Sequence, residues 1–294
     1  MSVVVTGSNG LLGSSLVAHF GAAKKPLIGI DLGSSSNQHL GAHEYYDCDL
    51  SNYDQVTELI ERLHPRVIMH GAAMTNVDGC EAQREAAWRV NVEATAHLAA
   101  LSEKLGAHLV YVSTDYVFDG RSGSYDETSL LSPLGIYALT KAAGELSVRT
   151  HASQWAICRT SVPFGPFTHV KKDFVRWLRD ELTAKKPVRI VTDQISNPTY
   201  APDLARMLVQ VADTGYTGVL HTAGATSLSR FELATTIAKT FSLDAGLIQA
   251  IKTADLRQAS PRPLDGSLSV HKARSLGFQP KTIDEALAIL KAVS

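Results

Sequence analysis

The chain has 294 residues, of which 45% are hydrophobic and 19% charged, and its formal net charge is −1. This composition is that of an ordinary globular protein, long enough for one large domain or for a large and a small one. The near-neutral charge without a long basic run argues against nucleic-acid binding, and no apolar run approaches the roughly 20 residues that span a bilayer. Because the N-terminus enters an apolar strand without a signal-peptide pattern, we expect a cytoplasmic protein without a membrane partner.

The N-terminal segment predicts a strand, a glycine-rich turn, a helix and a second strand. Ser2 to Val5 is a β-branched run, and apolar residues at helical spacing run from Leu11 to Phe20. Between them lies the turn Gly7-Ser8-Asn9-Gly10-Leu11-Leu12-Gly13. Glycines let the backbone approach a diphosphate closely, and the helix N-terminus favours its negative charge. In this strand–turn–helix context the turn predicts a dinucleotide site.

Asp31 bears on the choice between NAD and NADP. It follows the second predicted strand, Pro26 to Ile30. Its carboxylate can accept hydrogen bonds from the adenosine ribose hydroxyls, and it would repel a 2′-phosphate. The following residues 32–35 include no arginine for such a phosphate. We therefore expect NAD or NADP as the cofactor, with NAD favoured; the alternative interpretation of Asp31 is an aspartate that only closes a turn.

Helical and strand-like segments continue to alternate through the first half. A helix is expected over 53–63, and strands are expected over 44–46, 66–70, 109–112 and 155–159. This alternation predicts an α/β fold with a Rossmann-type, doubly wound parallel sheet. Ligands bind beyond the carboxyl ends of the strands in such sheets. Gly71-Ala72-Ala73 lies at one such end and is small enough for a flat ring to lie close, and Ser113-Thr114-Asp115 lies at another.

Tyr137 and Lys141 lie four residues apart in a predicted helix. Residues at this spacing share a face, so the Lys141 ammonium is expected to lower the pKa of the Tyr137 phenol. The phenol could then exchange a proton with a substrate oxygen near neutral pH. Alone, such a pair also fits a solvated helix surface. Its position downstream of a dinucleotide motif favours catalysis.

Several motifs carry a resemblance to a known family. The Gly-x-x-Gly-x-x-Gly spacing resembles the extended branch of the short-chain dehydrogenase/reductase superfamily. The string Ser113-Thr114-Asp115-Tyr116-Val117-Phe118-Asp119-Gly120 is more specific and resembles the dTDP-4-dehydrorhamnose reductase family. Further motifs of that family follow in the same order: Asp193-Gln194, Asn197-Pro198-Thr199-Tyr200, Gly218-Val219-Leu220-His221 and Arg262-Pro263. The resemblance spans the chain from Gly7 to about Leu276.

The resemblance implies roles for individual residues. Thr114 would polarise the substrate C4 carbonyl, Tyr137 would donate a proton as hydride arrives, and Lys141 would hold the nicotinamide ribose. The turn and the resemblance together give these cofactor contacts: Gly7, Asn9, Gly10, Leu11, Leu12, Gly13, Asp31, Asp49, Leu50, Ala72, Ala73, Ser113, Tyr137 and Lys141. The expected substrate contacts are Thr75, Thr114, Asp115, Val162, Phe174, Gln194 and Arg262. Thr114 and Asp115 each have an alternative interpretation as residues that only cap a turn.

Four positions bear on the reaction and on its substrate. Tyr116 stands where related dehydratases usually have a glutamate, which favours simple reduction. Val162 stands where the resembled family usually has a tryptophan, and Asp173 stands where it usually has an asparagine. Arg262 is the candidate for the substrate diphosphate because a guanidinium can grip phosphate oxygens bidentately, although a surface ion pair is the alternative.

The resemblance implies two domains and one activity. Residues 1–160 are expected to form the NAD(P)-binding Rossmann domain. Residues 161–294 are expected to form mainly a smaller, discontinuous substrate domain, with some segments returning to the sheet. The implied activity is NAD(P)H-dependent reduction of the C4 keto group of dTDP-4-dehydro-L-rhamnose to dTDP-L-rhamnose. Another nucleotide 4-ketosugar stays open as the substrate, as does a non-catalytic NAD(P)-binding role like that of the methionine adenosyltransferase regulatory subunit.

The expected partner is a nucleotide sugar, and a homodimer is the assembly that we consider. The three cysteines are far apart and predict neither a disulfide framework nor a zinc site. Most of the eleven histidines are isolated in the sequence. We therefore expect no metal.

Overall fold

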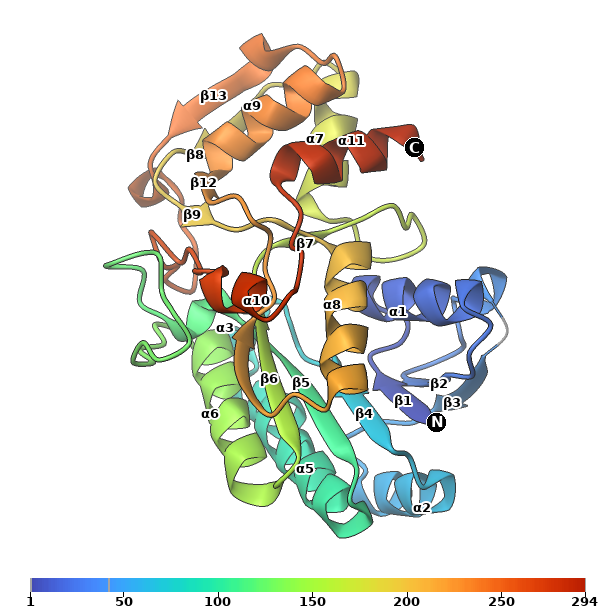
Figure 1. The fold of residues 1–294 in the computed structure, drawn as a ribbon. Coiled ribbons are helices and arrows are strands. Elements are labelled where there is room, and N and C mark those ends of the chain that lie inside the picture. The colour runs from blue at the N-terminus through green and yellow to red at the C-terminus, as the bar shows by residue number, and fades with distance from the viewer. Residues whose placement is uncertain (1, 42, 294) are drawn as a thin grey trace.

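The computed structural model describes residues 2–41 and 43–293 (Figure 1). Its main element is a sheet of seven parallel strands in the order β11-β6-β5-β4-β1-β2-β3. The strands are β1 (Val3–Thr6), β2 (Ile28–Asp31), β3 (Glu44–Asp47), β4 (Val67–His70), β5 (His108–Thr114), β6 (Trp155–Thr160) and β11 (Gly218–His221). The predicted doubly wound parallel sheet is confirmed.

Apolar side chains alternate between the two faces of this sheet, as the strand period of two requires. Val3 and Val5 belong to one core cluster, and Val4 belongs to the other. The first cluster lies under α1 (Leu11–Ala22) and α8 (Ala201–Thr214), and the second lies under α2 (Tyr53–Leu63), α5 (Ala94–Leu105) and α6 (Ile136–His151). Both faces are therefore covered by helices, which is why the central strands β1 and β4 are buried and mostly apolar, whereas the edge strand β3 is more polar.

A smaller part, drawn above the sheet in Figure 1, has a core of its own. Its helices are α7 (Phe174–Thr183), α9 (Arg230–Thr240) and α11 (Ile283–Ala292), and its longer strands β8 (Val188–Val191) and β13 (Ile248–Ile251) pair in parallel. Two further pairs are β7 (Pro163–Phe164) with β10 (Thr199–Tyr200) and β9 (Ile195–Ser196) with β12 (Leu228–Ser229). The two residues of β7 form a strand because the backbone of β10 lies beside them.

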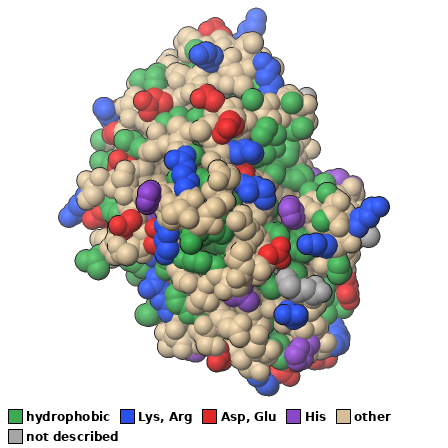
Figure 2. Space-filling model, in the orientation of Figure 1, with side chains coloured by type: hydrophobic (Ala, Val, Ile, Leu, Met, Phe, Trp, Pro, Cys, Tyr) green, Lys and Arg blue, Asp and Glu red, His purple; other side chains and the backbone are tan. Residues whose placement is uncertain are grey.

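The remaining described elements are short. They are α3 (Val77–Ala82), α4 (Arg84–Trp88), α10 (His271–Ser275), the π-helical η2 (Arg89–Glu93) and the 3₁₀ turns η1 (Gln38–Leu40), η3 (Asp115–Val117), η4 (Ala245–Leu247) and η5 (Thr253–Asp255). Across the part of the chain that the structure describes, no helix is both long and apolar enough to cross a membrane. Figure 2 shows acidic and basic side chains interspersed over the displayed face, as the near-neutral net charge predicts.

Candidate active site

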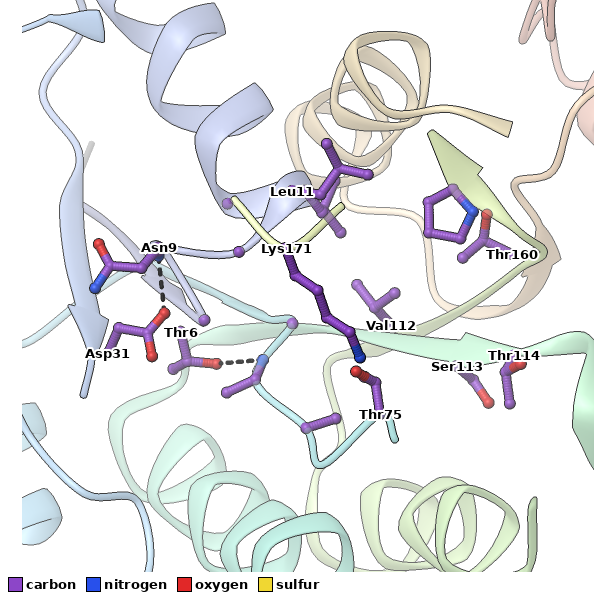
Figure 3. Close-up of a pocket in the computed structure, with 18 of the residues that line it drawn as sticks. Thr6, Asn9, Leu11, Asp31, Thr75, Val112, Ser113, Thr114, Thr160 and Lys171 are labelled. Carbon is purple, nitrogen blue, oxygen red and sulfur yellow. Dashed lines mark hydrogen bonds between the residues drawn. The ribbon is translucent and has the colours of Figure 1, made fainter. Parts of the chain in front are cut away.

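A cavity of about 770 Å³ lies where β1, β2, β4 and β5 end (Figure 3). Residues at or just beyond these strand ends line it, among them Thr6, Asp31, Ala72 and Thr114. Residues of the smaller part, such as Arg230, line it from the other side. The cavity therefore lies between the sheet and the smaller part, beyond the carboxyl ends of the strands, where doubly wound sheets bind their ligands.

The glycine turn forms one wall of the cavity through very close backbone contacts. A Cβ on Gly13 would lie 2.3 Å from the Gly7 carbonyl oxygen, and a Cβ on Gly7 would lie 2.8 Å from the Ala72 nitrogen. Gly7 also has a φ of +74°, a conformation that favours glycine. Gly10 caps the N-terminus of α1 without a side chain. The backbone amides of this helix end therefore face the cavity with nothing to shield them, as an anion site requires.

Asp31 and Asn9 organise the end of the cavity next to β2. The Asp31 carboxylate accepts hydrogen bonds from the backbone nitrogens of Asn9 and Leu32, both at 2.8 Å. The Asn9 side chain donates to the Leu32 and Ser34 carbonyls and accepts from the Ser36 nitrogen at 3.0 Å. Figure 3 shows the Asn9–Asp31 bond at the rim of the cavity. The Asn9 side chain thus shapes the loop after β2, and its backbone holds the acid in place.

Thr114 and Tyr137 meet at the opposite end of the cavity. The Thr114 hydroxyl, at the end of β5, donates to Asp115 Oδ1 at 2.9 Å and accepts from the Tyr116 nitrogen at 3.2 Å. Tyr137 lies in the first turn of α6, and its ring packs edge-on against Tyr116 at 5.9 Å. Burial raises the pKa of Tyr137 well above its ordinary value, and a hydrogen bond with Thr114 opposes this shift. The phenol therefore carries its proton at neutral pH.

Lys141 is buried and points toward β5 more than toward Tyr137. Its ammonium donates to the Val112 carbonyl at 2.8 Å and lies 4.1 Å from the centre of the Tyr111 ring. Burial lowers the pKa of Lys141 to about 7, and the Glu145 carboxylate opposes this shift. The structure thus differs from the expectation that Lys141 lowers the pKa of Tyr137. The helical spacing is present, but the ammonium bonds to a backbone carbonyl and burial dominates the pKa of the phenol.

A buried ion pair supports this end of the cavity from behind. Arg159 Nε and Nη2 donate to the Glu145 carboxylate at 2.8 and 2.7 Å, and the Ser113 hydroxyl donates to the same group at 2.7 Å. Glu145 lies one turn after Lys141 in α6, and Arg159 lies in β6. The network therefore ties α6 to β5 and β6. The Ser113 hydroxyl, in a residue that lines the cavity, is engaged by Glu145 in this network.

Asp115 is buried with both carboxylate oxygens occupied. Thr114 donates to one oxygen at 2.9 Å, and Ser161 donates to the other at 2.6 Å. Burial raises the pKa of Asp115 to about 6, and the two hydroxyls and the nearby Arg230 guanidinium oppose this shift. Arg230 lines the cavity at the start of α9, and its guanidinium lies 4.7 Å from the centre of the Phe174 ring. No sequence motif pointed to Arg230, because it reaches the site only through the packing of the smaller part.

Most of the predicted site residues line the cavity. They are Gly7, Asn9, Gly10, Leu11, Leu12, Gly13, Asp31, Asp49, Leu50, Ala72, Ala73, Thr75, Ser113, Thr114, Asp115, Tyr137, Lys141 and Val162. Phe174, Gln194 and Arg262 are not part of the lining. Gln194 donates to Thr253 at 3.1 Å, and Arg262 pairs with Asp78 at 3.0 Å. Arg262, the arginine expected to bind the substrate diphosphate, is thus paired with Asp78. Arg230, in contrast, lines the cavity near Asp115.

Val162 and Asp173, the two positions that depart from the family pattern, lie at the cavity and at the start of α7. Val162 lines the cavity with a φ of +41°, which is unusual for a β-branched residue. Asp173 caps α7 by accepting from the Arg176 nitrogen at 2.9 Å, and burial raises the pKa of its carboxyl. An acid at this position therefore has a structural role.

Within residues 2–41 and 43–293, no group of three or more His, Cys, Asp and Glu side chains could hold a metal ion.

Comparison with known proteins agrees with this geometry. The family model of the RmlD substrate binding domain matches residues 1–293. The chain is 32% identical over 303 residues to dTDP-4-dehydrorhamnose reductase of Aggregatibacter actinomycetemcomitans, covering 99% of this chain and 98% of the relative. It is 30% identical over 286 residues to methionine adenosyltransferase 2 subunit beta of Xenopus laevis, covering 95% and 83%. The crystal structure of dTDP-4-dehydrorhamnose reductase from Bacillus anthracis in complex with NADP superposes with a TM-score of 0.86 at 29% identity, covering 100% of this chain and 99% of that one.

Proposed function

The chain belongs to the dTDP-4-dehydrorhamnose reductase family, and on this basis we propose that it reduces the C4 keto group of dTDP-4-dehydro-L-rhamnose to give dTDP-L-rhamnose. It is an NAD(P)-dependent oxidoreductase. The observation that carries the proposal is one continuous cavity, with a glycine turn at one end and Thr114, Tyr137 and Lys141 at the other. A nicotinamide dinucleotide supplies the hydride when bound.

The residues of this chain supply the proton and the position of the carbonyl. The Tyr137 phenol holds its proton at neutral pH because burial raises its pKa. As negative charge develops on the C4 oxygen, Tyr137 donates this proton to it, and the Thr114 hydroxyl donates a hydrogen bond to the same oxygen. Lys141 donates hydrogen bonds to the ribose next to the nicotinamide. Thr114 and Lys141 are buried, and the low local dielectric strengthens these interactions.

We propose NADH as the preferred reductant. The support is Asp31, whose carboxylate is held at the cavity rim by the Asn9 and Leu32 backbone nitrogens. A fixed carboxylate there accepts hydrogen bonds from ribose hydroxyls and repels a 2′-phosphate. The relative from Bacillus anthracis binds NADP, so the comparison of both cofactors is part of the test.

We propose that residues 1–160 hold the dinucleotide and that the later segments hold the nucleotide sugar. The support is the second core around α7, α9 and α11, which presents Val162, Asp173 and Arg230 to the cavity. β11 and α8 belong by their packing to the sheet and its covering layer. The substrate part is therefore built from several separate stretches of the chain.

The direct test supplies enzymatically made dTDP-4-dehydro-L-rhamnose with NADH and with NADPH in separate reactions. We expect rapid loss of the reduced nicotinamide absorbance, faster with NADH at limiting concentration. Faster oxidation of NADPH would overturn the cofactor preference and leave the reductase assignment intact. An absence of oxidation with either cofactor, while both bind, would overturn the proposed substrate.

A non-catalytic role is the second candidate, because the chain is also similar to methionine adenosyltransferase 2 subunit beta. Retention of Thr114, Tyr137 and Lys141 around one cavity favours the enzyme, since binding alone does not need this geometry. Turnover in the assay above decides between the two.

A homodimer stays a prediction. Leu139 and Leu146 on α6 are 45% and 66% exposed, and light scattering of the purified protein checks whether two copies associate.

A further inference from the structure

A strap formed by residues 165–173 connects β7 to α7 and is tied to the dinucleotide part of the chain. His169 Nε2 forms hydrogen bonds with Asn37 Oδ1 at 2.7 Å and with Ser14 Oγ at 3.2 Å. Asn37 and Ser14 are fully buried, so His169 bonds to side chains that are held in place by the surrounding packing. The Arg176 guanidinium donates to the Phe167 and Val170 carbonyls at 2.7 and 2.5 Å. The strap is therefore fixed on both sides.

Lys171 lies next to these fixed points and lines the cavity. Figure 3 shows its side chain extending into the cavity toward β5. Among the described residues, no acidic group forms an ion pair with its ammonium. The neighbouring Lys172 differs, because its ammonium pairs with Asp180 at 2.6 Å. Both lysines line the cavity, but the Lys172 ammonium is paired with Asp180 of α7, whereas among the described residues the Lys171 ammonium has no acidic partner.

The other cations near the cavity are already engaged. Lys141 donates to the Val112 carbonyl, Arg262 pairs with Asp78, and Arg230 interacts with Asp115. The glycine turn supplies backbone amides and a helix N-terminus, but no full positive charge. Both proposed ligands carry a diphosphate with two negative charges. Lys171 is the cation that the fold leaves available to neutralise one of them.

We propose that Lys171 is a diphosphate-binding residue, which the strap holds over the cavity so that its ammonium pairs with a bound ligand. This inference rests on the proposed function, because the dinucleotide and the nucleotide sugar are the two sources of the diphosphate. An ammonium is a flexible point charge that suits phosphate oxygens. His169 then acts as a positioning residue, since its bonds to Asn37 and Ser14 fix the strap that carries Lys171.

The test compares Lys171→Ala with the matched control Lys172→Ala, which removes the same charge from the same strap. Two probes are used: NADH, followed by its fluorescence, and dTDP, followed by calorimetry in the presence of saturating NAD⁺. We expect Lys171→Ala to weaken the binding of one probe by about 10-fold or more. Lys172→Ala should change the affinity for neither probe by more than about 2-fold. Lys171→Arg keeps the charge and should restore most of the binding. The affinity of the wild type should also fall more steeply with salt than that of Lys171→Ala.

Each result has a defined meaning. A loss confined to NADH assigns Lys171 to the cofactor diphosphate, and a loss confined to dTDP assigns it to the substrate diphosphate. Equal losses in Lys171→Ala and Lys172→Ala would show a general charge effect and overturn the inference. Unchanged binding of both probes to Lys171→Ala would also overturn it, with the proposed function intact. If the wild type bound neither probe, the proposed function would fail first and the inference with it.

Discussion

The two ends of the cavity are built from different parts of the chain. The glycine-turn end is made mainly of backbone, with Gly7 and Gly13 packed so closely that a Cβ would not fit. The catalytic end is made of buried ionisable side chains, namely Asp115, Tyr137 and Lys141, whose pKa values are all shifted by burial. Backbone dipoles do not titrate, whereas buried side chains do. Binding at the first end should therefore tolerate changes of pH that alter the protonation of the second.

The sharpest test of this comparison is Tyr137→Phe. Removal of the proton donor should lower kcat by about 10²–10⁴-fold and leave the NADH affinity nearly unchanged, because the glycine turn stays intact. Steady-state kinetics and a fluorescence titration of the same preparation measure both quantities. Tyr53→Phe, which removes a hydroxyl that bonds to Glu93 outside the cavity lining, is the control and should keep full turnover. Undiminished turnover of Tyr137→Phe would refute the assigned proton donor.

The buried ion pair behind the catalytic end should carry much of its stability. Arg159→Ala removes the buried guanidinium nearest to the Glu145 carboxylate and leaves it with the Ser113 hydroxyl and the Arg149 guanidinium at 3.6 Å, which should lower the free energy of unfolding by about 3–5 kcal/mol. Urea denaturation followed by circular dichroism measures the change. Arg84→Ala removes the exposed partner of Glu81 and should cost no more than about 1 kcal/mol. Similar losses of unfolding free energy in the two variants would mean that the buried ion pair stabilises the fold no more than an exposed one.

At the glycine-turn end the damaging change is steric. Gly13→Ala would place a methyl group 2.3 Å from the Gly7 carbonyl oxygen, so the turn must open. We expect a loss of about 1–3 kcal/mol in stability together with loss of NADH binding. Gly106→Ala, at a position with a φ of +63° and no atom within 4 Å of the added Cβ, should cost about 1 kcal/mol and leave NADH binding unchanged. Normal NADH affinity in Gly13→Ala would contradict the role of the close contact.

The smallest effect concerns pH. The pKa of Asp115 is about 6 in the folded protein and has its lower, ordinary value in the unfolded chain. Between these two values the folded state holds the proton more tightly, so stability falls as pH rises through this window. Asp115→Asn should remove a slope of at most about 1.4 kcal/mol per pH unit and make the variant relatively more stable above pH 6. Urea unfolding of both proteins across pH 4 to 7 measures the difference, and parallel curves would show that Asp115 does not titrate there.

Local sequence patterns were sufficient to predict the architecture and the glycine-turn end of the cavity. The expected helix over 53–63 has the observed bounds, because its apolar periodicity matches the face that it buries. The turn from Gly7 to Gly13 was readable because its chemistry is backbone chemistry. Helical spacing alone places Tyr137 and Lys141 of α6 on one face, and their catalytic role stays a prediction.

The sequence by itself determined the parallel sheet and the glycine turn, and it predicted Thr114, Tyr137 and Lys141 as the catalytic side chains. Only the tertiary structure decided how those side chains are charged and which cations reach the cavity. Lys141 bonds to Val112, Arg262 pairs with Asp78, and Arg230 and Lys171 arrive from segments whose sequence carries no motif. The physical reason is that burial and ion pairing depend on contacts between distant parts of the chain, whereas periodicity and turn chemistry depend on neighbours in sequence.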